Sequence, residues 1–323
     1  MNRVCVVTPA YNDWESLTRL LIDLDEVGKQ SDLRFRVLVV DDSSTLPAPE
    51  GWPGLEHSQL ESLTIVRLAC NLGHQRAIAV GLVMTHTDLE ECAGVIVMDS
   101  DGEDLPSDLP RLMTASVSHP GSIVCARRAR RSEPAAFRAF YRGYQLLFGA
   151  LTGAHIDFGN FCLIPTSVLR AVISQAGIWN HLAATLTRSR LPLYRIDTQR
   201  GTRYARQSKM NFVSLVVHGL TAVAVYADVA LVRIVILAMV LAGCSFLGIV
   251  LTVCIRLGTS LAIPGWASGV AGTLTVLLFQ AVLIPAIGVF VVLSSRTART
   301  VVPLVDAKNF VESIRSIQPR SDG

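Results

Sequence analysis

Residues 94–104 read GVIVMDSDGED, a short apolar run followed directly by a cluster of carboxylates. The run Gly94–Met98 does not alternate between apolar and polar residues, which is typical of a strand covered on both faces. In an extended segment alternate side chains project to the same side, so Asp99, Asp101 and Glu103 can share a ligand. Hard carboxylate oxygens suit Mg²⁺ or Mn²⁺. The pattern alone also fits a solvated turn, and its place after a strand favours the metal.

The rest of the N-terminal half repeats this succession of apolar run and helix. Three further runs without alternation lie upstream, at Val4–Thr8, Phe35–Val40 and Leu63–Leu68. Helical periodicity follows three of the four runs, at Trp14–Val27, Gln75–Met84 and Ser107–Val117. Strands that alternate with helices indicate an α/β domain with parallel strands and right-handed crossovers. We expect a loop over Pro47–Leu60, which contains Pro, Gly and Glu.

A polar cluster directly follows each predicted strand. The clusters are Pro9-Ala10-Tyr11-Asn12-Asp13, Asp41-Asp42-Ser43, Asn71-Leu72-Gly73-His74 and Asp99-Ser100-Asp101. Ligands of open α/β sheets bind at the carboxyl ends of the strands, where such clusters converge. Any one cluster fits turn or N-cap chemistry, whereas four at one edge predict a binding site. Asp41 and Asp42 are placed to accept hydrogen bonds from a base or a ribose.

The motifs that the sequence lacks disfavour several classes of protein. No G-x-G-x-x-G follows the first strand and no G-x-x-x-x-G-K-[ST] occurs, which disfavours a Rossmann dehydrogenase and a P-loop ATPase. The seven cysteines include no C-x-x-C pair, so neither a disulfide framework nor a zinc site is indicated. The sequence opens into a strand without the h-region of a signal peptide, and we expect this part to stay in the reducing cytosol.

The composition places part of the chain in lipid. Of the 323 residues 50% are hydrophobic and only 17% are charged, and the mean hydropathy is +0.43. Two uninterrupted apolar stretches, Ile234–Ile255 and Val270–Leu293, are long enough to span a bilayer. The first reaches about 33 Å as a helix, against a hydrocarbon core of about 30 Å. Arg233 precedes the first stretch, and Arg296 and Arg299 follow the second, so the positive-inside rule puts both chain ends in the cytoplasm.

These observations divide the chain into four parts. We expect a soluble domain over 1–210, a membrane-surface helix over 211–232, a transmembrane hairpin over 233–295 and a cytoplasmic tail over 296–323. The surface helix is predicted because Asn211–Tyr226 is apolar, carries few charges and lies just before the first span. The chain is thus expected to be an integral membrane protein with its soluble domain on the cytoplasmic face. Whether copies associate through the spans as a homo-oligomer stays open.

The charges of the soluble part separate by sign. Residues 1–126 hold 8 basic and 19 acidic side chains, whereas residues 127–210 hold 14 basic and 3 acidic ones. The basic part suits anions such as phosphates or anionic lipid, although a solvated surface gives the same count. Aromatic residues are interleaved with arginines over Arg127–Arg142, a pattern that also fits nucleic acid. The two spans nearby favour a lipid phosphate, and no nucleic-acid partner is expected.

Together these residues resemble family 2 glycosyltransferases of the GT-A fold, and within them the dolichol-phosphate mannose synthases and bacterial polyprenyl-phosphate glucosyltransferases. The resemblance covers about residues 3–255. It rests on Thr8-Pro9-Ala10-Tyr11-Asn12-Asp13, Val40-Asp41-Asp42-Ser43-Ser44, Asn71-Leu72-Gly73-His74-Gln75, Met98-Asp99-Ser100-Asp101-Gly102-Glu103-Asp104-Leu105-Pro106, and Arg203 followed by Ser208-Lys209. It implies that residues 1–210 form an α/β domain of the GT-A type, Rossmann-like with a mostly parallel sheet, in front of the two-helix hairpin.

The resemblance also implies roles for individual residues. The nucleoside would be held by Pro9, Tyr11, Asp13 and Asp41. A Mg²⁺ or Mn²⁺ ion would be held by Asp99, Asp101 and Glu103, the last standing where the family usually has Gln. The donor diphosphate or the lipid phosphate would be held by Arg127, Arg138, Arg203 and Lys209. The catalytic residues would then be Asp101, Asp157 and Arg203.

Two segments depart from the family pattern. Residues 157–162 read DFGNFC where the family commonly shows an Asp-Thr-Gly-Asp-Phe-Arg pattern, so Asn160 and Cys162 replace an acid and a cation. Arg206 and Met210 replace a usual Gly and Tyr. These departures bear on the acceptor more than on the donor. Asp157 is either an orienting or basic residue of the site or a hydrogen-bonding residue at the edge of the core.

The expected activity is a metal-dependent glycosyl transfer that inverts the anomeric configuration. The resemblance implies a nucleotide-diphosphate sugar of the UDP-glucose or GDP-mannose type as donor and a polyprenyl phosphate as acceptor at the cytoplasmic membrane face. Two alternatives stay open. One is a membrane glycosyltransferase that acts on a glycolipid or another hydroxyl acceptor, and the other is a non-catalytic membrane subunit that binds nucleotide sugar.

Overall fold

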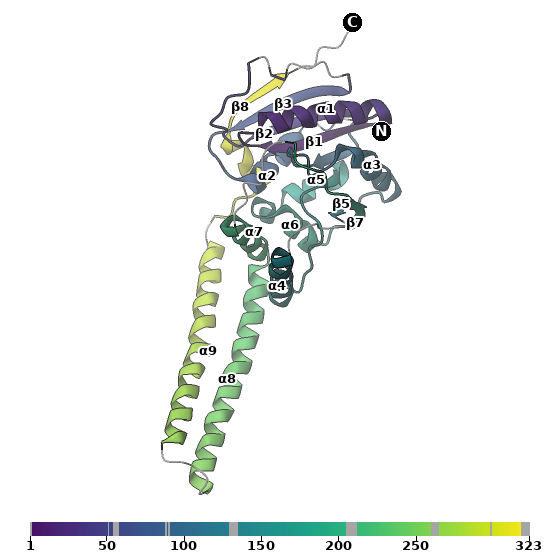
Figure 1. Ribbon diagram of the computed structural model, residues 1–323. Coiled ribbons are helices and arrows are strands. Elements are labelled where there is room, and N and C mark those ends of the chain that lie inside the picture. The colour runs from purple at the N-terminus through teal and green to yellow at the C-terminus, as the bar shows by residue number, and fades with distance from the viewer. Residues whose placement is uncertain are drawn as a thin grey trace. The chain divides into compact units, whose positions relative to one another are not determined.

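The structure is a computed structural model, and it divides into two compact units that we describe separately (Figure 1). It describes residues 2–50, 52–53, 58–87, 89, 91–128, 135–204, 212–259, 265–297 and 299–317, without the side chains of 128, 135–141, 212–215 and 295–297. The first unit comprises 1–142, 154–225 and 301–323, and the second comprises 143–153 and 226–300. The first unit thus contains most of the predicted soluble domain, residues 211–225 of the predicted surface helix and residues 301–323 of the predicted tail.

The first unit is built on an eight-stranded sheet with the strand order β7-β5-β6-β4-β1-β2-β3-β8. The strands are β1 (Arg3–Ala10), β2 (Arg34–Asp41), β3 (Leu60–Leu68), β4 (Gly94–Val97), β5 (Ile123–Arg128), β6 (Cys162–Pro165), β7 (Leu193–Thr198) and β8 (Val311–Ile317). The four strands predicted from the sequence, β1 to β4, are parallel neighbours. The predicted α/β class with a mostly parallel core is confirmed.

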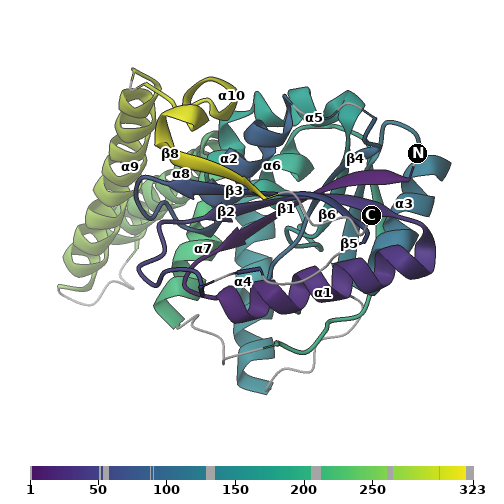
Figure 2. The same ribbon diagram turned by 90° about the horizontal axis from the view of Figure 1, so that it is seen from above.

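Helices cover both faces of this sheet, with α1 on one side and α5 on the other (Figure 2). The helices of the first unit are α1 (Trp14–Ser31), α2 (His74–Thr85), η1 (Pro106–Asp108), α3 (Leu109–Ser118), α5 (Thr166–Ile173), η2 (Ala176–Trp179), α6 (Leu182–Arg188), α7 (Phe212–Val225), α10 (Pro303–Asp306) and η3 (Ala307–Phe310). Helix α4 (Ala135–Thr152) is shared between the units. The predicted helices at 14–27, 75–84 and 107–117 correspond to α1, α2 and η1 with α3.

Helix α1 illustrates how the sequence produces these layers. The Asp13 side chain caps its first turn by accepting from the Ser16 backbone N–H at 3.4 Å. Leucines at spacings of three and four then form one stripe, and all are fully buried: Leu17, Leu20, Leu21 and Leu24. They pack with Phe35 and Val37 of β2 in one of the two core clusters. The carboxyl end of β1 is therefore held next to the start of α1.

Strand β8 is the element that the sequence reading did not anticipate. It pairs antiparallel with β3, from Leu63 opposite Ile317 to Leu68 opposite Val311. The tail therefore completes the edge of the sheet instead of standing apart as a separate segment. The chain leaves the first unit after α7, passes through the apolar hairpin and re-enters the first unit at residue 301, where it goes on to form β8.

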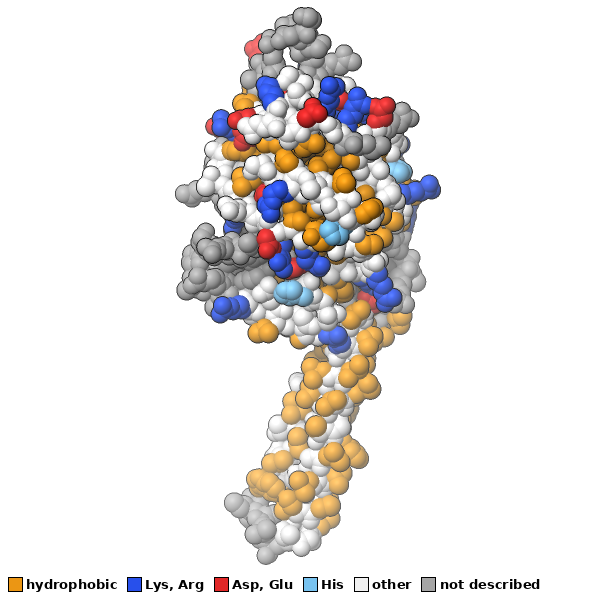
Figure 3. Space-filling model, turned by 90° about the vertical axis from the view of Figure 1, so that its right-hand side faces the viewer, with side chains coloured by type: hydrophobic (Ala, Val, Ile, Leu, Met, Phe, Trp, Pro, Cys, Tyr) orange, Lys and Arg blue, Asp and Glu red, His pale blue; other side chains and the backbone are white. Residues whose placement is uncertain are grey.

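The second unit consists mainly of two apolar helices, α8 (Ala227–Gly258) and α9 (Trp266–Thr297). Their mean hydropathies reach 2.8 and 2.7, and each contains a predicted span. Large apolar side chains such as Leu247 and Phe290 are exposed along them, and hydrophobic side chains are spread along the face of the hairpin that Figure 3 shows. An apolar surface of this extent is normally covered by lipid or protein. Both helices are long and apolar enough to cross a membrane.

Arg233 caps another helix within the second unit. Its Nη1 donates to the carbonyl oxygens of Gly149 at 3.1 Å and Ala150 at 2.8 Å, near the C-terminal end of α4. A cation at this end satisfies free carbonyls and complements the helix dipole. Arg233, the positive residue in front of the first predicted span, thus also stabilises the end of α4.

The residue before helix α6 is a histidine, His181, whose charge state affects stability. The ring Nδ1 of His181 accepts from the Ala184 backbone N–H at 3.3 Å, and His218 lies against the ring with the two centroids 4.7 Å apart. Burial, together with the neighbouring His218 and His74, lowers the pKa of His181 to about 3. The native state therefore holds His181 neutral where the unfolded chain, with a pKa near 6.5, already takes up a proton.

We expect the unfolding temperature of the full chain in detergent to fall as the pH is lowered from 7 to 5. Below pH 6.5 this histidine alone removes up to about 1.4 kcal/mol of stability per pH unit. His181→Asn keeps an N-cap acceptor but no titrating ring, so its unfolding temperature should depend less on pH. Identical pH slopes for the two proteins would contradict the assignment.

Candidate active site

The acidic loop after β4 is held in shape by its own carboxylates. The Asp104 Oδ2 accepts from the Asp99 backbone N–H at 3.0 Å, and the Asp101 Oδ1 accepts from the Glu103 N–H at 3.0 Å. The chain turns at Gly102, which has a φ of +89°. The Ser100 hydroxyl donates to the Pro9 carbonyl at 3.3 Å, so the loops after β1 and β4 meet at one edge of the sheet.

A second segment, residues 200–204, lies directly against this loop. The Tyr204 N–H donates to the Asp101 carbonyl at 2.9 Å, and the Gly201 N–H donates to the Glu103 carbonyl at 3.0 Å. The Tyr204 hydroxyl donates to Asp23 of α1 at 2.7 Å. Main-chain hydrogen bonds therefore fix the predicted residue Arg203 beside the predicted carboxylates.

Two arginines of this segment pair with the acidic loop. Arg203 Nη2 lies 3.0 Å from Asp101 Oδ2, and its Nε donates to Glu103 Oε1 at 2.8 Å. Arg200 Nη2 donates to the same Glu103 oxygen at 2.5 Å. Burial alone would raise the pKa of Glu103, but the hydrogen bonds and charges of both arginines lower it below its ordinary value. Glu103 is therefore an ionised anchor for the two arginines.

Asp99 and Asp101 have the carboxylates that a divalent cation prefers, and Glu103 is paired with two arginines in this structure. Burial, and next the negative charge of Asp99, raise the pKa of Asp101, so this pair has a deficit of positive charge that a cation would relieve. Asp99 Oδ1 lies 3.2 Å from His74 Nε2. Over the described ranges no three His, Cys, Asp or Glu side chains are grouped so as to hold a metal. A Mg²⁺ site with two carboxylates is completed by water or substrate phosphates.

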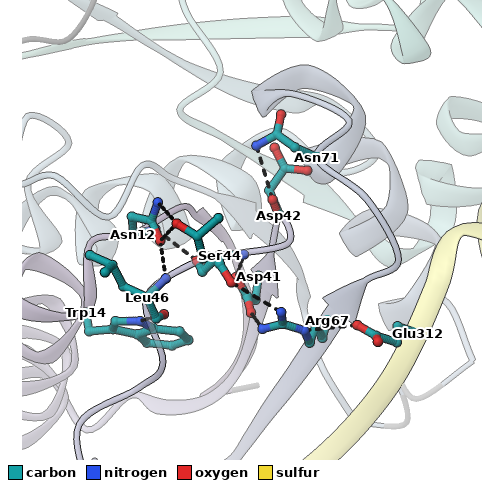
Figure 4. Close-up of polar contacts among 10 residues, drawn as sticks. Asn12, Trp14, Asp41, Asp42, Ser44, Leu46, Arg67, Asn71 and Glu312 are labelled. Atoms are coloured by element: carbon teal, nitrogen blue, oxygen red, sulfur yellow. Dashed lines mark hydrogen bonds and ion pairs between the residues drawn. The ribbon is translucent and has the colours of Figure 1, made fainter.

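The predicted nucleoside residues lie at the ends of β1 and β2, and Figure 4 shows Asp41 among them. Asp41 is buried, with Oδ1 accepting from the Ser44 N–H and Oδ2 from Arg67 Nη1, both at 2.9 Å. Tyr11 is exposed at the same edge, and Asp13 serves as the N-cap of α1. All four nucleoside candidates, with Pro9 at the end of β1, thus lie at one edge, where Asp13 also has a structural role.

Asp42 has a different task from Asp41. Its two carboxylate oxygens accept from the Leu72 N–H at 2.7 Å and the Gly73 N–H at 2.9 Å, and its carbonyl accepts from the Asn71 side chain at 3.2 Å (Figure 4). Burial raises the pKa of Asp42 in spite of these backbone hydrogen bonds. Both Asp42 oxygens therefore shape the loop between β3 and α2, whereas those of Asp41 accept from Ser44 and Arg67.

The predicted phosphate-binding residues are only partly within the described structure. Arg127 Nε donates to Asp197 Oδ1 at 2.7 Å and its Nη1 lies 3.9 Å from Asp157 Oδ2. Asp157 is closer to Arg195, at 2.9 Å. Arg127 and Asp157 thus belong to one ion-pair cluster. Arg138 lies in α4 but its side chain is outside the described residues, and so are Lys209, Arg206 and Met210.

A hydrogen-bonded row beside the acidic loop was not predicted. Asn160 Nδ2 lies 3.0 Å from His74 Nε2, its Oδ1 accepts from Gln75 at 3.0 Å, and Gln75 Oε1 accepts from the Leu182 N–H at 2.8 Å. Asn160, one of the departures from the family pattern, also lines a small cavity with Asp99 and Glu103. The departure of Asn160 from the family pattern was the signal in the sequence that could have identified this cavity.

Gly102 provides a direct test of the contact between the two segments. A Cβ added there would lie 2.9 Å from the Thr202 carbonyl oxygen and 2.9 Å from the Tyr204 ring. Gly121 also has a positive φ but nothing within 4 Å of its added Cβ, so Gly121→Ala is the matched control. Each alanine costs about 1–2 kcal/mol for the left-handed backbone. Gly102→Ala should lower the unfolding temperature clearly further, and equal shifts would show that the segments do not pack as described.

Comparisons with known proteins show which family the chain resembles. A family model described as Glycosyl transferase family 2 matches residues 5–172. An undecaprenyl-phosphate 4-deoxy-4-formamido-L-arabinose transferase of Serratia proteamaculans is 26% identical over 289 residues, covering 86% of this chain and 83% of that protein. The protein of the same name from Proteus mirabilis is 29% identical over 133 residues, covering 41% of this chain and 39% of that protein.

Among solved structures, the fold matches glucosyl-3-phosphoglycerate synthase from Mycobacterium tuberculosis, crystallised with Mn²⁺, UDP-glucose and phosphoglyceric acid. The TM-score is 0.50 at 16% identity, over 71% of this chain and 80% of that chain. At this identity the likeness shows the fold alone, which is the GT-A fold expected from the motifs. Because the family model spans more than half of the chain and includes the acidic loop, we conclude that the chain belongs to glycosyl transferase family 2.

Proposed function

We propose that this protein transfers a sugar from a nucleotide-diphosphate sugar to a polyprenyl phosphate at the membrane surface. The observation that carries the proposal is the contact between Arg203 and Asp101 at the carboxyl edge of the sheet, in a chain that also carries two apolar helices. The relatives named undecaprenyl-phosphate transferases support this acceptor class. A donor of the UDP-glucose or GDP-mannose type stays our proposal for the sugar nucleotide.

The reaction needs charge stabilisation more than proton transfer. A phosphate monoester has a second pKa near 6, so the acceptor is already an anion at neutral pH. One of its oxygens forms a bond to the anomeric carbon as the bond from that carbon to the diphosphate oxygen breaks, and the nucleoside diphosphate leaves with the electron pair. Attack from the face opposite the leaving group inverts the configuration. The main task of the site is to neutralise the departing diphosphate.

The chain offers distinct groups for this task. Asp99 and Asp101 would hold a Mg²⁺ or Mn²⁺ ion, which when bound would supply a Lewis acid for the diphosphate. Arg203, beside them, is placed to donate to the diphosphate oxygens, and Glu103 orients Arg203 and Arg200. Arg127, Arg138 and Lys209 are proposed for the acceptor phosphate, and the nucleoside is proposed to lie at the edge that carries Tyr11 and Asp41.

We also propose that the first unit lies on the cytoplasmic side. The chain enters the hairpin after α7 and returns to the sheet as β8, so two spans bring it back to the side where it started. Arg233 and Arg299, on the flanks of the spans, favour the cytoplasm under the positive-inside rule. Both chain ends would then be cytoplasmic.

Transfer of radiolabelled sugar from UDP-glucose or GDP-mannose into an organic-extractable lipid, in membranes that contain the full chain, tests the proposal. We expect an acid-labile product, because a sugar phosphodiester of a polyprenol is acid-labile, and we expect EDTA to abolish its formation and Mg²⁺ or Mn²⁺ to restore it. An acid-stable glycolipid would instead identify a hydroxyl acceptor. Donor binding by calorimetry without transfer to any lipid would identify a non-catalytic subunit.

A further inference from the structure

A row of charged groups connects the C-terminal strand to the nucleoside edge (Figure 4). Arg67 on β3 lies opposite Asp41 on β2 in the sheet register, and its Nη1 donates to Asp41 Oδ2 at 2.9 Å. On its other side Arg67 Nε donates to Glu312 Oε2 of β8 at 3.0 Å. The strand that follows the hairpin is therefore linked to Asp41 through the guanidinium of Arg67.

The guanidinium of Arg67 is held in a single plane by three acceptors. Besides the two carboxylates, its Nη2 donates to the Ser44 carbonyl at 3.2 Å. Ser44 also donates its backbone N–H to Asp41 Oδ1, so the loop after β2 and the guanidinium share partners. A planar guanidinium held by three hydrogen bonds has little conformational freedom, whereas the ammonium of a lysine at this position would be only a point charge.

Arg67 is more accessible than the carboxylate that it holds. The Asp41 side chain is only 3% exposed, whereas that of Arg67 is 39% exposed. An arginine has more N–H donors than the three contacts use, and the remaining ones are available to a ligand. A nucleoside that approaches this edge would therefore meet the guanidinium first, with the Asp41 carboxylate behind it.

We infer that Arg67 contacts the nucleoside of the donor and that Glu312 is a positioning residue that holds Arg67 in place, so that the strand after the hairpin takes part in donor recognition. The inference rests on the proposed function, because it places the nucleoside at Asp41. Since Arg67 only donates hydrogen bonds, it favours bases with a carbonyl acceptor, such as uracil or guanine, at this position.

The test compares Glu312→Gln with the unaltered full chain in membranes or detergent. Glu312 is 56% exposed, so its loss should weaken the hold on Arg67 moderately: we expect the donor KM to rise about threefold while kcat stays within about twofold. Glu312→Asp keeps the charge and should restore most of the affinity. Arg315→Gln removes a charge from the same strand outside this row and should leave the donor KM unchanged, so it is the matched control.

Arg67→Gln should raise the donor KM at least tenfold, and Arg67→Lys should recover little of it, because it cannot make the three contacts. Arg67→Gln leaves the buried Asp41 charge without its ion-pair partner. If that protein fails to fold, the Glu312 variants still test the inference. An unchanged KM in Glu312→Gln overturns the inference. A lower kcat and a lower unfolding temperature of Glu312→Gln without a change in KM would also overturn it, because they would show a purely structural role.

Calorimetry with UDP and GDP separates this inference from the proposed function. If the unaltered protein transfers sugar but Glu312→Gln binds UDP and GDP as tightly as it does, only the inference fails. If no lipid is glycosylated but Glu312→Gln weakens nucleotide binding, the proposed transfer fails and the inference stands. An unaltered protein that neither binds nucleotide nor transfers sugar contradicts both.

Discussion

Asp101→Asn should lower sugar transfer by about a thousandfold or more, because it removes a charge that both holds the expected cation and pairs with Arg203. Asparagine has nearly the same size as aspartate, so the loop keeps its shape. Partial burial and the charge of Asp99 already raise the pKa of Asp101, and removing one of two neighbouring, partly buried charges should not destabilise the fold. The measurement is the initial rate of labelled lipid formation at saturating donor, together with the unfolding temperature.

Asp108→Asn is the matched control for this prediction. Asp108 follows the same loop and is also buried, and burial raises its pKa as well, but its partner is Arg111 on α3 at 2.7 Å. It therefore reports the general effect of exchanging a buried carboxylate for an amide. Comparable transfer rates in Asp101→Asn and Asp108→Asn would remove Asp101 from the catalytic site.

The core of the fold could be predicted because its signal is local. Strands β1 to β4 are continuous apolar runs, and a strand buried on both faces needs such a run whatever the rest of the chain does. The strands β5, β6 and β7 were not predicted. Strand β6 spans only Cys162–Pro165, and its antiparallel pairing between β4 and β5 depends on where distant segments return to the sheet.

Strand β8 could not be found by the same means. Five of its seven residues are exposed, so it lacks the apolar run that identifies a buried strand. Its position is determined by pairing with β3, more than 240 residues earlier in the chain. The ion pair of Arg67 with Glu312 depends on this pairing and was missed with it, whereas the pair with Asp41 depends on the register of β2 and β3.

The acidic site shows where local reasoning succeeds and where it stops. Placing Asp99 and Asp101 at a sheet edge needs only the strand before them, and the structure brings Arg203 to them as the motif implies. The expectation that Glu103 joins the same ligand set assumed an extended segment. The positive φ of Gly102 turns the chain between Asp101 and Glu103, and Glu103 pairs with two arginines, so its place in the ligand set stays a prediction.

Arg203→Ala should lower the transfer rate about a hundredfold, which is the usual cost of removing one donor to a developing charge. Arg203 contacts both Asp101 and Glu103, and of the two arginines on Glu103 it is the one beside the expected cation site. Arg200 pairs with Glu103. Arg200→Ala should therefore cost no more than about tenfold, since it removes an orienting contact and leaves the donor to the diphosphate in place.

The two arginine variants together distinguish a catalytic donor from a structural ion pair. If Arg203 acts on the departing diphosphate, the loss appears mainly in kcat, because the charge that it neutralises is larger in the transition state than in the bound donor. Arg203→Lys keeps the positive charge without the fork and should recover part of that loss. If Arg203 only neutralises the acidic loop, its alanine variant would match Arg200→Ala in rate, and both would show their effect in the unfolding temperature.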